Sequence, residues 1–156
     1  MRAKPSTLSQ LLFLIGTPLC AQRPAGPGHH LDTLSLQPVT EQPLVGIVAG
    51  LSEIGNFWMP GGHAALRTLF LPGPSSSDPN QQRVFVLLRP MAHSGHPIVF
   101  ELPQVDGARI QNTATDQVNH EFLVEYSRDN FIVRRHRVRV IDPEHVHVVD
   151  EIVRFF

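Results

Sequence analysis

The sequence has little cysteine and little lysine, and both scarcities exclude mechanisms. Cys20 is the only cysteine and Lys4 is the only lysine among 156 residues. If the N-terminal segment is removed as expected below, the remaining chain has no disulfide and no cysteine metal ligand. It also has no amine for Schiff-base chemistry or for a phosphate-binding loop. The domain must therefore be stabilised by packing.

The net charge is also low. The chain carries 13 basic and 14 acidic residues, a formal net charge of -1 at pH 7. Such a chain has no global field that attracts nucleic acid or an anionic membrane, so electrostatic binding has to come from a local patch. We expect no nucleic-acid partner. The hydrophobic share of 42% and the charged share of 17% are typical of one globular domain.

Residues 1–21 have the pattern of a secretory signal peptide. Arg2 and Lys4 form a charged start, residues 8–19 form an apolar stretch, and Ala21 offers a small residue for cleavage. The apolar stretch is shorter than the roughly 20 residues that a membrane-spanning helix needs, so we expect no transmembrane anchor. The pattern predicts a secreted or periplasmic protein, with a buried N-terminal helix or a mitochondrial targeting sequence as the alternatives.

Residues 22–43 are rich in proline and glycine, which predicts an extended lead-in rather than a helix or a central strand. His29 and His30 lie in this segment, and we interpret them as solvated side chains. Residues 44–156 then predict one domain.

That domain is predicted to be mainly β, a single antiparallel β-sandwich or barrel-like domain. Short runs of β-branched and aromatic residues alternate with turn-forming residues throughout it. The predicted strands are 44–48, 66–71, 83–89, 98–102, 108–111, 120–127, 131–141 and 146–155. For residues 62–70, one short peripheral helix is the alternative to a strand.

The turn residues predict how strands pair. Asp106-Gly107 predicts a hairpin between its flanking strands, because glycine accepts positive φ. Residues 127–130 and 142–145 predict the next two turns, so the last third of the chain is interpreted as a β-meander. Alternation in residues 121–126 places the aromatic side toward the core.

The final predicted strand has a helical alternative. Asp142 is suited to cap a helix and Pro143 to occupy its first position. The many β-branched residues between Val146 and Val153 favour a strand instead.

Four arginines on residues 131–141 form a candidate site for a polyanion, and they are Arg134, Arg135, Arg137 and Arg139. In a strand, the last three project from one face about 7 Å apart, a spacing suited to sulfates or carboxylates. The alternative is a ladder of ion pairs with the next strand. A turn at residues 142–145 predicts Arg137 opposite Asp150 and His136 opposite Glu151.

Histidines form a second candidate site. His145 and His147 share one side of a strand, and His136 lies on the neighbouring strand. With His93 or His96 from a loop, these residues predict a zinc or copper site as an alternative function.

Two further features are weaker. Ser94 beside His93, with acids such as Glu101 and Asp116, offers hydrolase groups, yet no catalytic motif is present, and we favour a non-catalytic protein. Residues 56–62 contain the only tryptophan in an expected loop. Its aromatic side chains are predicted to close the end of the sandwich, with a binding hot spot as the alternative.

The leading hypothesis is therefore an exported binding or adhesion module that recognises a protein or a polyanionic, polysaccharide-like partner. A metal-binding protein outside the cytoplasm and a structural module that pairs through its sheet edges are the alternatives.

Overall fold

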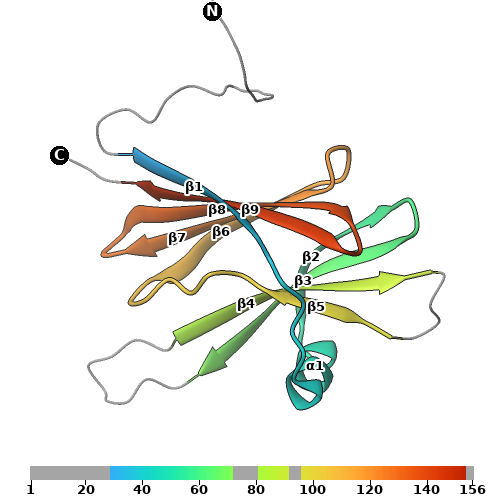
Figure 1. Ribbon diagram of the computed structural model, residues 1–156. Helices are drawn as coiled ribbons and strands as arrows, with labels where there is room; N and C mark the ends of the chain where they lie inside the picture. Colours follow the sequence, from blue (N-terminus) through green and yellow to red (C-terminus); the bar gives the residue numbers. More distant parts are fainter. Residues whose placement is uncertain (1–28, 72–80, 92–95, 154–156) are drawn as a thin grey trace, which may run out of the picture. The chain divides into compact units, whose positions relative to one another are not determined.

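The computed structural model describes residues 29–71, 81–91 and 96–153 (Figure 1). The chain divides into two units after His30, and the fold belongs to the second unit. The expected signal peptide, residues 1–21, lies outside the described residues. The elements in chain order are β1 (His29–Ser35), α1 (Gln42–Ala49), β2 (Glu53–Met59), β3 (Gly62–Leu71), β4 (Gln81–Pro90), β5 (Ile98–Glu101), β6 (Arg109–Asp116), β7 (Glu121–Arg128), β8 (Phe131–Asp142) and β9 (His145–Val153).

The described strands form two antiparallel sheets (Figure 1). The five-stranded sheet has the order β1-β9-β8-β7-β6, and the four-stranded sheet has the order β2-β3-β4-β5. We call the face of each sheet that is turned toward the other its inner face, and the opposite one its outer face. Side chains from both inner faces share one core, which includes Phe57, Leu66, Val86, Phe100, Phe122, Val124, Val138 and Val148. The mainly β, sandwich-like fold predicted from the sequence is confirmed.

Strand β4 is apolar without alternation because it is buried on both faces. Val84, Val86 and Leu88 belong to the core between the sheets. Phe85 and Leu87 point the other way and pack in a second cluster with residues of α1. A strand covered on both sides has a continuous apolar sequence. The four-stranded sheet is therefore the middle layer between the five-stranded sheet and α1 (Figure 1).

A helix occupies the place of the first predicted strand. The prediction of a strand over residues 44–48 is wrong, because α1 covers Gln42–Ala49. Pro43 stands in the first turn of the helix, where its missing N–H costs no hydrogen bond. Val45 and Val48 are both buried in the cluster on the outer face of the four-stranded sheet. This burial outweighs the weak β preference of valine.

One arginine of β3 holds the C-terminal end of α1. The Nη1 atom of Arg67 donates hydrogen bonds of 2.8 Å to the carbonyl oxygen of Ala49 and 2.9 Å to that of Leu51. A cation at the carbonyl end of a helix also complements the helix dipole.

Among the residues that the structure describes, none belongs to a helix both long and apolar enough to cross a membrane.

The turn at Asp106 and Gly107 connects the two sheets. Gly107 has the positive φ that the sequence predicts, +69°. However, β5 pairs with β4, and β6 pairs with β7. The predicted hairpin is wrong, because turn residues determine the local bend and not the strand to which the next segment pairs. The helical alternative for residues 62–70 is also wrong, since they lie in β3.

The last third of the chain is the predicted meander. β6, β7, β8 and β9 pair in succession, and Asp129 and Asn130 adopt positive φ in the turn between β7 and β8. Residues His145–Val153 form a strand, which confirms the strand and not its helical alternative. Phe122 and Tyr126 face the core, as the alternation predicts.

The register between β8 and β9 differs by one residue from the prediction. Arg137 was expected opposite Asp150, and His136 opposite Glu151. In the structure His136 is opposite Asp150, and Arg135 is opposite Glu151. The prediction is wrong because the pairing shifts at an irregularity just before the turn, where β8 contains one extra residue.

The segment after β1 ties the two sheets together. The N–H of Leu36 donates to the carbonyl oxygen of Val146 on β9, at 2.9 Å. Three residues later, the N–H of Val39 donates to the carbonyl oxygen of Val99 on β5, at 2.7 Å. Part of the expected lead-in, residues 22–43, is therefore built into the domain and bridges the two sheets.

Candidate functional site

The four candidate arginines lie on two faces of β8. Arg137 and Arg139 are exposed on the outer face of the five-stranded sheet, and Arg135 lies on the same side. Arg134 points to the other side of the strand, which it shares with the buried His136. The alternation within β8 therefore separates Arg134 from the other three.

Acidic residues on the neighbouring strands neutralise most of the outer arginines. Arg135 lies between two carboxylates, 2.9 Å from Glu125 on β7 and 2.8 Å from Glu151 on β9. Arg139 lies 2.6 Å from a carboxylate oxygen of Glu121. These contacts form the ladder of cross-strand ion pairs that was the alternative interpretation. Each of these arginines donates two of its five N–H groups to carboxylates, which also balance its charge and so weaken its attraction for a polyanion.

Arg137 is the exception on this face. Its neighbours in the register are Leu123 on β7 and Val149 on β9, and its side chain is exposed. Within residues 29–71, 81–91 and 96–153, the structure gives its guanidinium no ion pair. Among the described residues, Arg137 is thus the one arginine of the four candidates without a direct ion pair, and it interacts at longer range with Asp116.

His136 belongs to a buried polar network. Its Nδ1 lies 3.0 Å from the hydroxyl of Tyr126, and its Nε2 lies 3.0 Å from Oδ1 of Asp150. Arg134 donates two hydrogen bonds of 2.7 Å to the two carboxylate oxygens of Asp150. Burial lowers the pKa of His136 to about 4, so the imidazole is neutral at pH 7. Burial also raises the pKa of Tyr126.

This network joins three strands. Its members come from β7, β8 and β9, and the side chain of His136 is 0% exposed. Although burial opposes ionisation of Asp150, the hydrogen bonds from Arg134 lower the pKa of this carboxyl. Burying the charge of Asp150 is tolerable because Arg134 supplies a bidentate partner.

The structure does not bring the candidate metal ligands together. His145 and His147 share one side of β9, as predicted, and it is the outer side, whereas His136 points into the core. His96 is exposed just before β5 in the other sheet, and His93 lies outside the described residues. In the described part of the chain, no group of three His, Cys, Asp or Glu side chains is placed to hold a metal ion.

The acids considered for hydrolysis have structural partners. Glu101 accepts two hydrogen bonds from Arg83, at 2.8 and 2.7 Å. Asp116 accepts a hydrogen bond of 3.0 Å from the N–H of Asn119 and closes the turn before β7. Ser94, the candidate nucleophile, lies outside the described residues.

The only tryptophan is on the surface. The segment expected as a loop forms β2, so Phe57 and Trp58 point to opposite faces. Phe57 is 1% exposed in the core, whereas Trp58 is 62% exposed. The prediction that the aromatic side chains close the sandwich is confirmed for Phe57 and wrong for Trp58.

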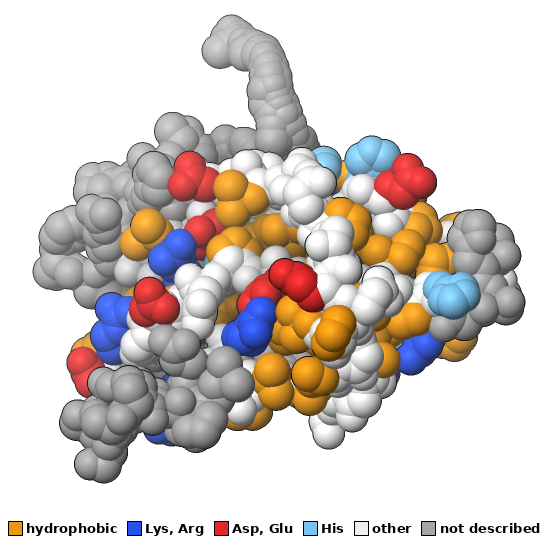
Figure 2. All heavy atoms as spheres, turned by 60° about the horizontal axis from the view of Figure 1, so that its bottom comes forward, with side chains coloured by type: hydrophobic (Ala, Val, Ile, Leu, Met, Phe, Trp, Pro, Cys, Tyr) orange, Lys and Arg blue, Asp and Glu red, His pale blue; other side chains and the backbone are white. Residues whose placement is uncertain are grey.

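Figure 2 shows that hydrophobic side chains gather in several groups on the described surface of this view.

Trp58 begins a row of three side chains across the outer face of the four-stranded sheet. It is opposite His63 on β3, which is opposite Arg89 on β4. The rings of Trp58 and His63 lie 4.5 Å apart between centroids, tilted by 52°. Arg89 is exposed and has no ion pair or side-chain hydrogen bond within the described residues. We call these residues the Trp58–His63–Arg89 row.

The backbone of Trp58 is held from the other sheet. Its N–H donates to the side-chain oxygen of Gln117, at 3.1 Å, and its carbonyl oxygen accepts a hydrogen bond from the side-chain nitrogen of the same residue. Gln117 follows β6, so these bonds join the edges of the two sheets. They leave the indole on a fixed backbone.

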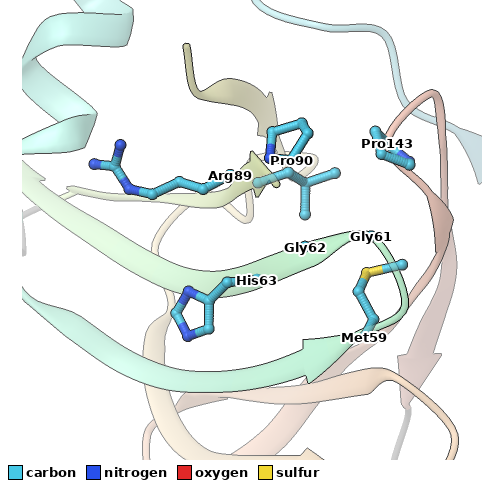
Figure 3. A pocket seen from close by; sticks show the side chains of 8 residues that line it. Met59, Gly61, Gly62, His63, Arg89, Pro90 and Pro143 are labelled. Atoms are coloured by element: carbon cyan, nitrogen blue, oxygen red, sulfur yellow. The ribbon is translucent and has the colours of Figure 1, made fainter. Parts of the chain in front are cut away.

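A small hollow lies beside the row (Figure 3). It is lined by residues of three strands, β2, β3 and β4, and of two turns, the one between β2 and β3 and the one between β8 and β9. These residues are Met59, Gly61, Gly62, His63, Leu88, Arg89, Pro90 and Pro143. In Figure 3 the side chains of His63 and Arg89 extend to one side, away from Met59 and Pro143. The hollow has room for little more than one water molecule, far less than a small-molecule site requires.

Sequence reasoning missed this row, although the pattern contained a signal. In an edge strand, Phe57 and Met59 share one side and Trp58 necessarily takes the other.

Comparisons of the chain with protein families, with curated proteins and with solved structures give no match.

Proposed function

We propose that this chain is an exported, non-catalytic module that binds another macromolecule, either a protein or a polyanionic, polysaccharide-like partner. The observation that carries the proposal is the exposed indole of Trp58, which is 62% accessible on a strand whose backbone is fixed by Gln117. Tryptophan is among the residues that most often dominate binding energy at macromolecular surfaces.

Rigidity strengthens this argument. A side chain on a paired strand has less freedom to lose when a partner binds than one on a loose loop. The ring of His63 also restricts the indole on one side, at 4.5 Å between ring centroids. The surface is therefore organised for contact before any partner arrives.

The electrostatic part of the proposal rests on two arginines that form no ion pair within the part of the chain that the structure describes. Arg137 and Arg89 are exposed on the outer faces of different sheets. An unpaired guanidinium can form bidentate hydrogen bonds with a carboxylate or a sulfate, whereas Arg135 and Arg139 already use theirs on glutamates.

The export part of the proposal rests on residues 1–21 alone. Expression of the whole chain in a secreting host, followed by mass spectrometry of the exported product, tests it. We expect a product that begins at Gln22 and therefore has no cysteine. An exported product that retains residues 1–21, or retention of the whole chain inside the cell, would overturn this part.

Binding is tested with the purified chain immobilised on a sensor surface. The analytes are heparin, alginate, neutral dextran and a panel of cell-surface proteins, each at low and moderate salt. We expect at least one analyte whose binding is lost in Trp58→Ala while the fold, followed by circular dichroism, is unchanged. If every analyte that binds does so equally well to Trp58→Ala, the indole is not the recognition surface and the proposal fails.

A further inference from the structure

The Trp58–His63–Arg89 row has the length of a short linear ligand. Adjacent strands lie about 4.8 Å apart, so the backbone positions of Trp58 and Arg89, two strands apart, are separated by about 10 Å. This span accommodates two consecutive sugar rings, one over the indole and the next beside the guanidinium.

The row presents donors to such a ligand. The structure shows no partner for the indole Nε1–H of Trp58 or for the guanidinium of Arg89 among the described residues. His63 lies between them, and its Nε2 is 3.4 Å from the side-chain oxygen of Asn56. A ligand that satisfies these groups must be rich in acceptor oxygens and must place a negative charge beside Arg89.

The nearest acid on β2 does not cancel this charge. One carboxylate oxygen of Glu53 accepts a 2.6 Å hydrogen bond from Asn56, and the other lies 3.5 Å from Arg67. Arg67 itself is engaged with the end of α1. Arg89 therefore remains the unbalanced charge of the row.

We infer that the Trp58–His63–Arg89 row is a binding site for an acidic oligosaccharide, one whose sugar rings carry carboxylates. The C–H groups on one side of a sugar ring form a flat apolar surface that stacks on the indole of Trp58. The carboxylate of the next ring pairs with Arg89, one ring hydroxyl accepts from Nε1–H of Trp58, and another donates to Nδ1 of His63, whose Nε2 faces the side-chain oxygen of Asn56. This inference rests on the proposed function and names the ligand class for the same surface.

Single-stranded nucleic acid also stacks on aromatic side chains, but the row is poorly suited to it. Such ligands carry one phosphate per nucleotide and require a groove with several cations. The row supplies the single arginine Arg89, and the whole chain has a formal net charge of -1. A saccharide with one charge per ring matches one arginine beside one aromatic ring.

Fluorescence gives a direct test because Trp58 is the only tryptophan in the chain. The full chain is titrated with a tetramer of galacturonic acid, with the uncharged tetramer of galactose and with a short oligouridylate. We expect the acidic tetramer to change the emission of Trp58 in a saturable way. The neutral tetramer is expected to bind roughly tenfold more weakly, because it lacks the charge-assisted contact to Arg89.

Calorimetric titration of variants tests the roles assigned to Trp58 and Arg89, the two ends of the row. Trp58→Ala and Arg89→Ala are each expected to weaken the acidic tetramer about tenfold or more. Arg109→Ala, which removes an exposed arginine of β6 on the other sheet, is the matched control and is expected to bind normally. Arg89→Lys, which keeps the charge without the fork of donors, is expected to recover part of the affinity.

The outcomes separate the inference from the proposed function. Equal affinity for acidic and neutral tetramers, or normal binding by Arg89→Ala, overturns the inference. If the chain instead binds a protein in a Trp58-dependent way and ignores both tetramers, the inference is overturned and the proposed function stands. Trp58-dependent binding of oligouridylate alone overturns both. If no analyte depends on Trp58, both fail.

Discussion

His136 and Asp150 face each other across β8 and β9, with the imidazole Nε2 3.0 Å from the carboxylate Oδ1. The pair is buried on the inner side of the sheet, where Tyr126 contacts the second ring nitrogen of His136. Burial lowers the pKa of this histidine from 6.5 to about 4. Between these two pH values His136 is therefore neutral in the folded protein and protonated in the unfolded chain.

This difference predicts a loss of stability in mild acid. Between pH 6.5 and pH 4 the unfolded state is protonated at His136 and the folded state is not, so the free energy of unfolding falls as the pH falls through this window. The expected loss is about 3 kcal/mol over the whole window. Urea denaturation at pH 7, 6, 5 and 4.5 measures it, and His136→Gln should show a smaller slope. Equal slopes in the two proteins would contradict the prediction, as would an NMR titration in which His136 charges near pH 6.5.

The two hydrogen bonds between the side chain of Gln117 and the backbone of Trp58 predict a second effect. In Gln117→Ala the N–H and the carbonyl oxygen of Trp58 lose their partners. Because both groups lie at an exposed edge and water replaces part of the loss, we expect a cost of about 1 kcal/mol. The fluorescence anisotropy of Trp58 should also decrease as the strand edge loosens. Gln111→Ala, on a nearby strand, is the control. Unchanged anisotropy would show that Gln117 does not fix the indole.

Arg67 is expected to be the most important arginine for stability. Arg67→Met keeps the apolar stem but leaves the carbonyl oxygens at the end of α1 without their donor. The loss of charge-assisted bonds in a mostly buried place predicts a decrease of about 2–3 kcal/mol in the free energy of unfolding. The exposed Arg137→Ala should change it by less than about 0.5 kcal/mol. Equal stability of the two variants by urea denaturation would refute this ranking.

Heparin chromatography separates the arginines of the outer face. Among the described residues Arg137 has no carboxylate within ion-pair distance, although Asp116 interacts with it at longer range, whereas Arg139 lies 2.6 Å from Glu121. Arg137→Ala should therefore reduce retention more than Arg139→Ala does. Glu121→Gln should increase retention, since it releases Arg139. If Arg137→Ala and the wild type elute at the same salt concentration, this face contributes nothing to polyanion binding.

The sequence was most informative where a strand has one buried face. In β7, Phe122, Val124 and Tyr126 alternate with residues that remain partly exposed, and turn residues mark both ends. The periodicity and the turn chemistry therefore agree with each other. The same reasoning located β8 and β9 and their connection.

Local pattern was insufficient where a distant segment decides the outcome. The β-branched residues of 44–48 favour a strand, but the outer surface around Phe85 and Leu87 needs a cover, and α1 supplies it. The one-residue shift between His136 and Asp150 depends on an irregularity in β8 that has no glycine or proline to announce it.

The candidate sites show the same division. The face on which each arginine lies followed from alternation, whereas its neutralisation depended on which strand lies beside it. Glu125 and Glu151 approach Arg135 from two different strands, and only the pairing of β7 with β8 and of β8 with β9 brings them there. For the same reason, the three members of the Trp58–His63–Arg89 row were not recognised as neighbours.

The pairing of β1 bears on when the domain can be completed. β1 has β9 as its neighbour in the sheet, and the bond from Leu36 to Val146 joins residues more than a hundred positions apart. Such a distant contact forms slowly and only after the intervening chain is available. The strand nearest to the proposed export signal thus has no partner until β9 has emerged. The edge of the five-stranded sheet that β1 forms is therefore completed last.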